Sequence, residues 1–214
     1  MKIRSTLELT SALENALAWR KKEITTLYFQ IHNCQQVHIK EALLRATIPI
    51  LYAHWEGFTK EAAMFYLELV ARQRLKYSDL KTNFVALSCR STLKEIASSN
   101  KTYLHTQLVD FLTFNQNDCA NIPYSNVIDT ESNLSSIVLK NILFTLGLPF
   151  DDFWQGKSLA IDGSLLYYRN KIAHGERHDL KEDTFTELHD LVINSLDQFK
   201  ISIENTAIHK GYKR

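Results

Sequence analysis

The sequence is poor in glycine, proline and cysteine. Its 214 residues include six glycines, three prolines and three cysteines. Glycine and proline punctuate the turns between short strands, so their scarcity disfavours a sheet protein and favours long helices. Cys34, Cys89 and Cys119 are odd in number and show no CxxC spacing, which disfavours a disulfide framework and a zinc site. We expect reduced thiols, as in a cytoplasmic protein.

A dominant charge sign and a long apolar run are also missing. Lys and Arg number 25 against 24 Asp and Glu, so any nucleic-acid contact has to come from a local patch. No segment approaches the roughly 18 consecutive apolar residues of a membrane span, and the first ten residues lack the apolar run of a signal peptide. The sequence therefore predicts a cytoplasmic protein with no membrane contact. At this length we expect a single domain over residues 1–214.

One apolar stripe of eight residues dominates the middle of the chain. Its members alternate in steps of four and three, the period of a helix face, which predicts a helix of about 35 residues. Pro49 lies inside the stripe. Proline removes one backbone donor, but the pattern continues beyond it, so we expect a kink there and not an end. The members are Leu44, Ile48, Leu51, Trp55, Phe58, Ala62, Phe65 and Leu69.

Further helices are predicted on both sides of this one. A capping box of Ser5 and Glu8 opens the first, Gly147 ends another, and Thr184 opens the last. The polar segment 115–129 is expected to be a loop, and the basic tail HKGYKR to be frayed. The pattern predicts an all-α protein with a long kinked helix. The additional helices are predicted at about 5–34, 80–98, 102–114, 131–146 and from 184 onward.

The stretch YYRNKIAHGE, residues 167–176, carries the candidate chemistry. On a helix that Gly175 ends, His174 lies about 140° round from Arg169 and about 7.5 Å along the axis, with Asn170 between them in angle. Arg169 and His174 therefore flank one face and do not stack. They converge if the helix loosens at Gly175, or if a second copy packs against this face across a two-fold axis.

These side chains suit the cleavage of RNA through its own 2′-hydroxyl. His174 is a natural acid or base near neutral pH. Arg169 offers a planar fork to phosphate oxygens, and Asn170 could orient the imidazole or donate to the phosphate. An arginine and a histidine five residues apart also occur by chance. The alternative is a solvated arginine beside a histidine that the helix dipole stabilises at a C-terminus.

Three regions of the chain resemble a known family. The string RNKIAHG resembles the arginine–polar–x3–histidine motif of the HEPN superfamily of helical-bundle ribonucleases. PILYAHWEGFTKEAAMFY (49–66) and TESNLSSIVLKNILFTLGL (130–148) resemble the long helix and the middle segment of the RiboL-PSP-type HEPN proteins. The resemblance covers most of the chain, and it places Arg169, Asn170 and His174 at motif positions.

The resemblance implies an all-α, HEPN-like helical bundle that forms a homodimer with a composite site. It implies RNA as the substrate, cleaved without a metal or another cofactor. It further implies a toxin or anti-phage defence effector, with an antitoxin or another defence-system protein as a partner. No spacing of histidine, cysteine or acidic residues predicts a metal site.

Three further residues are candidate RNA contacts. Tyr168 could stack on a base, although a place in the core or in an interface also fits it. Lys171 lies inside the motif. Glu56 stands one residue off the apolar stripe, so it could face the cleft as a second acid or pair with a surface lysine.

Two other interpretations of the whole chain stay open. One is a non-catalytic HEPN-type module that binds a partner protein or a nucleotide and keeps the motif for dimer contacts. The other is a helical protein with a chance motif. An enzyme needs Arg169 and His174 in a cleft that solvent reaches, whereas a structural role would bury them with satisfied partners.

Overall fold

Helices make up the regular structure of the chain in a computed structural model that describes residues 2–177 and 179–214. The prediction of an all-α fold is confirmed. Among the described residues, no helix is both long and apolar enough to cross a membrane. The elements are α1 (Thr6–Asn33), α2 (Val37–Arg72), the 3₁₀ turn η1 (Tyr77–Asp79), α3 (Thr82–Ser88), α4 (Arg90–Ala97), α5 (Thr102–Phe114), α6 (Ser136–Leu146), α7 (Asp152–Ala160), the π-helix η2 (Ile161–Leu166), α8 (Tyr167–Ala173) and α9 (Glu182–Ile208).

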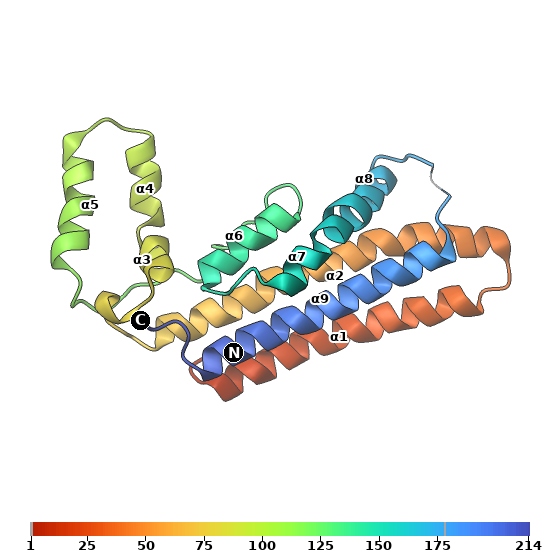
Figure 1. The fold of residues 1–214 in the computed structure, drawn as a ribbon, viewed down its shortest axis with the longest axis horizontal. Coiled ribbons are helices and arrows are strands. Elements are labelled where there is room, and N and C mark those ends of the chain that lie inside the picture. The colour runs from red at the N-terminus through yellow and green to blue at the C-terminus, as the bar shows by residue number, and fades with distance from the viewer. Residues whose placement is uncertain (1, 178) are drawn as a thin grey trace.

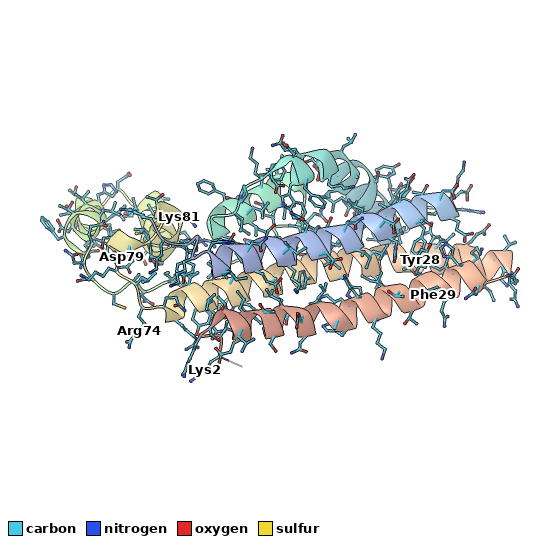
Figure 2. The ribbon with its side chains drawn as sticks, turned by 60° about the horizontal axis from the view of Figure 1, so that its bottom comes forward. Lys2, Tyr28, Phe29, Arg74, Asp79 and Lys81 are labelled. Atoms are coloured by element: carbon cyan, nitrogen blue, oxygen red, sulfur yellow. The ribbon has the colours of Figure 1, made fainter. Side chains whose placement is uncertain are left out.

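The three longest helices, α1, α2 and α9, run side by side and contact one another pairwise (Figure 1). The run α6, α7, η2 and α8 lies along the other side of α2. The α4–α5 hairpin stands out at the end of the molecule where both chain termini lie (Figure 1). At the opposite end α1 turns into α2, near Tyr28 and Phe29 (Figure 2).

Helix α2 forms the main seam of the core. It spans 36 residues and continues through Pro49, so the prediction that this proline does not end the helix is confirmed. Every member of the apolar stripe is buried except Phe65, which is half-buried against the core. Trp55 stacks on Trp154 of α7 at 5.8 Å between ring centres, and the same seam reaches α9 at Phe199.

Local signals set the start of α1. Ser5 Oγ accepts a hydrogen bond from the Glu8 backbone N–H at 3.2 Å, and the Glu8 carboxylate accepts one from the Ser5 N–H at 3.0 Å. A backbone hydrogen bond from Arg4 lowers the pKa of Glu8, and the bonds from Ser5 add to this effect. The predicted capping box is confirmed, since both halves of it form.

Three predicted helix bounds differ from the structure. The segment 80–98 is two helices, because Cys89 separates α3, which buries Phe84, from α4, which buries no residue. Helix α6 begins at Ser136 and not near 131. Glu131 has a φ of 53°, which a helix does not allow, and Ser135 supplies the cap. Helix α9 begins at Glu182, two residues before the predicted Thr184.

The prediction of a frayed tail is wrong. Tyr212 is only 3% exposed, and its carbonyl accepts a hydrogen bond from the Lys81 N–H at 3.0 Å. The Arg214 N–H donates to the Asp79 carbonyl at 3.0 Å. The C-terminal residues are therefore paired with η1 and the start of α3, the region where Figure 2 labels Asp79 and Lys81.

Replacing Phe58 by alanine should cost about 3–5 kcal/mol of unfolding free energy, because the ring is fully buried in the α2 seam and its loss leaves a cavity. Denaturant unfolding followed by circular dichroism measures this loss. The matched control is Phe114→Ala, since Phe114 is 76% exposed, and it should change stability by no more than about 0.5 kcal/mol. A similar small loss for Phe58→Ala would contradict the assignment of the buried face.

Candidate functional site

The motif lies on α8 and on the turn that ends it. The helix that was predicted to end at Gly175 is α-helical only from Tyr167, because the segment directly before it is the π-helix η2. Its predicted end is confirmed: Gly175 has a φ of 77°, and the Glu176 N–H reaches back to the Lys171 carbonyl at 3.0 Å. A left-handed residue with this return bond is the usual glycine termination of a helix.

Arg169 is half-buried and held from three directions. One guanidinium nitrogen, Nη1, donates to Asn133 Oδ1 at 2.8 Å and to Asn170 Oδ1 at 2.7 Å. The guanidinium carbon lies 4.8 Å from the centre of the Tyr52 ring on α2. All three neighbours are uncharged, and among the described residues Arg169 forms no ion pair with a carboxylate. Its side chain is therefore positioned while its charge stays available to an anion.

Asn170 and His174 occupy different environments. The side-chain oxygen Oδ1 of Asn170 accepts a hydrogen bond from Arg169, so the side-chain amide nitrogen of Asn170 is the group left to donate. His174 is exposed at the C-terminal cap of α8, where its backbone N–H donates a hydrogen bond to the backbone carbonyl of Asn170 at 3.0 Å. Within the described part of the chain no hydrogen bond joins Arg169 to His174. One copy thus presents a fixed cation and a separate, solvent-reaching imidazole on the same short helix.

Lys171 and Tyr168 have local partners. The Lys171 ammonium lies 2.5 Å from a Glu176 carboxylate oxygen and 5.8 Å from the Tyr167 ring centre. Its hydrogen bond to Glu176 raises the pKa of Lys171. Tyr168 is half-buried, packs against the core and meets the Tyr167 ring edge-on at 5.4 Å between centres. Of the places considered for Tyr168, the observed packing agrees with a side chain at the edge of the core.

Glu56 pairs with a lysine, as one of its two interpretations predicts. Its carboxylate accepts a hydrogen bond from Lys60 at 2.8 Å and another from the Thr130 hydroxyl. Burial alone would raise the pKa of Glu56, but these hydrogen bonds outweigh it and the pKa is lowered. Glu56 is therefore an anion on α2 that is bonded both to Lys60 of the same helix and to Thr130 of the loop that precedes α6.

Tyr52 connects Glu56 to Arg169, and sequence reasoning missed it. The hydroxyl of this buried residue accepts a hydrogen bond from the Leu134 backbone N–H at 2.7 Å. Burial raises the pKa of Tyr52 to about 12, and the nearby Glu56 carboxylate adds to the rise. Tyr52 stands four residues before Glu56, so both lie on one face of α2. This four-residue spacing is the sequence signal from which Tyr52 could have been placed beside Glu56.

The loop before α6 is fixed next to this site. Ser136, the first residue of α6, donates to the Asp162 carboxylate of η2 through its backbone N–H at 2.7 Å and through its hydroxyl. Leu134 is anchored on Tyr52. Asn133, which accepts a hydrogen bond from Arg169, therefore stands next to one anchored residue and three residues before another. No short-range sequence pattern predicts these contacts.

Among residues 2–177 and 179–214, no group of three or more histidine, cysteine or acidic side chains has the arrangement of a metal site.

A family model described as MAE_28990-like HEPN matches residues 9–212. The match includes α8 and all of α2. A search of curated proteins and a search of solved structures found no match.

Replacing Tyr52 by phenylalanine should cost about 1–3 kcal/mol of unfolding free energy, because the buried Leu134 N–H loses its acceptor. The aromatic face against Arg169 is retained. Denaturant unfolding measures the loss, and the matched control is Tyr103→Phe on α5, where the ring is 57% exposed. Equal stability of both variants would show that the Tyr52 hydroxyl does not hold the loop.

Proposed function

The chain belongs to the MAE_28990-like HEPN family, and from this premise we propose that it is an endoribonuclease whose site is built from Arg169, Asn170 and His174. HEPN domains are often ribonucleases. The observation that carries the proposal is the environment of Arg169: its side chain is fixed by two amide oxygens and a ring, and no carboxylate among the described residues offsets its charge. A cation positioned in this way suits the phosphate of a phosphodiester.

The proposed reaction is an in-line attack within the RNA. One imidazole takes the proton of the 2′-hydroxyl as its oxygen bonds to phosphorus, and the bond from phosphorus to the 5′-oxygen breaks. A second acid gives a proton to the leaving 5′-oxygen. The products are a 2′,3′-cyclic phosphate and a free 5′-hydroxyl. His174 is exposed and able to reach substrate, and Arg169 stabilises the charge on the phosphate oxygens.

The reaction also supports a homodimer. One imidazole cannot take a proton and give another in the same step, and each copy offers one His174 beside Arg169. A second copy packed across a two-fold axis supplies the missing group. Large exposed apolar side chains on the helical run that carries the motif favour such an interface, namely Leu159 at 83% and Tyr167 at 43% exposure.

The resemblance extends the proposal to biology. We propose a cytoplasmic toxin or anti-phage effector of the RiboL-PSP type, restrained by an antitoxin or another defence-system protein. A non-catalytic module that binds a protein or a nucleotide is the competing function, and RNA cleavage by the purified protein separates the two.

Replacing His174 by alanine should lower RNA cleavage by roughly 10²–10⁴-fold, because the proton-transfer group is removed. The measurement is incubation of purified protein with mixed RNA in EDTA, with analysis of the cleaved ends for a 2′,3′-cyclic phosphate. His105→Ala, at an exposed histidine of α5, is the matched control and should cut at the parent rate. An active His174→Ala protein, or a cleavage that needs divalent metal, would favour the binding module.

Arg169→Ala should also abolish most turnover, and Arg169→Lys should restore little, because an ammonium cannot copy a planar fork. Both proteins should keep the parent's circular dichroism spectrum. Full activity of Arg169→Lys would show that a point charge is enough and would remove the role assigned to the guanidinium geometry.

The protein should be a dimer at micromolar concentration, which light scattering coupled to gel filtration measures. Mixing the parent with an equal amount of His174→Ala should leave roughly a quarter of the activity given by the same total amount of parent, since only a quarter of the random dimers then hold both imidazoles, whereas independent sites would leave about half. A monomer that RNA does not convert into a dimer would contradict the composite site.

A further inference from the structure

A cleft of mixed polar and apolar lining lies next to the candidate site and is not used by the chemistry above. It has a volume of about 690 Å³ and lies between α4, the loop 123–131 and Lys60 of α2. Thr130 forms part of its wall and donates to Glu56. Three residues further along the chain, Asn133 holds Arg169. The cleft is therefore large enough for a nucleotide, and one continuous loop joins it to the fixed arginine.

Two of the three cations that line the cleft have no carboxylate partner among the described residues. Arg90 and Lys94 are four residues apart on α4, so they share a face, and both line the cleft. Arg90 donates to the Val127 carbonyl, and among the described residues neither cation forms an ion pair. The third cation is Lys60, which pairs with Glu56.

Two acidic residues also line the cleft, Asp129 and Glu131. One Asp129 carboxylate oxygen accepts the Glu131 backbone N–H at 2.8 Å, so the loop itself engages part of this acidic charge. Arg90 and Lys94 are the charged side chains of α4 that line the cleft and can meet a phosphate.

A second hollow continues the cleft toward α6. Its volume is about 300 Å³, and it shares Arg90, Val127 and Asp129 with the first. Its far wall includes Phe144, which is 72% exposed. Cations that follow a backbone, next to an exposed aromatic ring on which a base can stack, form the usual surface for single-stranded nucleic acid.

We propose that this groove, from Lys60 past Arg90 and Lys94 to Phe144, binds the single-stranded RNA that flanks the cleaved bond. The inference rests on the function proposed above. Phosphates contact Arg90 and Lys94, and one base stacks on Phe144. The groove lies between α4, the loop 123–131 and α6, and α4 belongs to the hairpin that stands out from the long helices (Figure 1). It therefore extends the substrate contact beyond the motif helix.

The test measures the affinity of a fluorescein-labelled single-stranded 12-mer RNA by anisotropy at several salt concentrations. All proteins carry His174→Ala so that the RNA stays intact. Adding Lys94→Gln should weaken binding several-fold and reduce the slope of log affinity against log salt by about 0.7, because one phosphate contact is lost. Adding Phe144→Ala should weaken binding about fivefold or more through lost stacking. Lys94 is preferred to Arg90 because Arg90 also holds the loop at Val127.

Matched controls are Lys22→Gln and Phe29→Ala, an exposed lysine and an exposed phenylalanine on α1. Both should bind the 12-mer as the His174→Ala protein does. If the groove variants also bind equally while the protein with His174 intact still cuts RNA, the groove is overturned and the nuclease stands. If the controls weaken binding as much as the groove variants, the RNA lies elsewhere and the groove is again overturned. Absence of both RNA binding and RNA cleavage would overturn the groove and the proposed function together.

Discussion

The burial of α2 on several sides is the constraint on which the rest of the structure depends. This helix contacts α1, α9, α6 and α8, so its buried polar side chains can be paired only inside the protein. Among the described residues Trp55 Nε1 and Tyr66 Oη stay without a hydrogen-bond partner, whereas others are satisfied. The Thr59 hydroxyl donates to the Trp55 carbonyl at 2.9 Å within the helix, and the buried His54 lies 2.9 Å from a Glu23 carboxylate oxygen on α1. On the side of the helix away from His54, Tyr52 and Glu56 take partners from the loop before α6. The candidate site is therefore one consequence of how α2 satisfies its polar groups.

The same constraint explains the placement of Arg169. A half-buried guanidinium loses part of its hydration, and that loss has to be offset by hydrogen bonds or by a ring. Two amide oxygens and the Tyr52 ring supply this compensation without neutralising the charge. Lys171 shows the contrasting solution only two residues away, since it is paired with Glu176. A cation that is fixed before the substrate arrives needs little reorganisation when a phosphate binds.

Local signals made most of the fold predictable. The capping box at Ser5 and Glu8, the apolar period of α2 and the left-handed Gly147 and Gly175 each act within a few residues, and each marks a helix where one is found. The motif itself was also visible from its letters. The contacts of Arg169 were not, because Asn133 is 36 residues away, and Leu134 is 82 residues from Tyr52. The α6 boundary was misplaced for the same reason, since contacts with α2 and η2 set the conformation of the loop before it.

That loop links the two parts of the surface proposed to meet RNA. Its first half forms the wall of the cationic groove, and its second half carries the oxygen that positions Arg169. Between them, Thr130 and Leu134 are each bonded to a side chain of α2, four residues apart. A phosphate bound at Arg90 or Lys94 would thus press on a segment that is anchored on both sides of Asn133. Because the loop is anchored in this way, the groove and Arg169 keep a fixed position relative to each other. An RNA strand bound in the groove is therefore held in register with the Arg169 guanidinium.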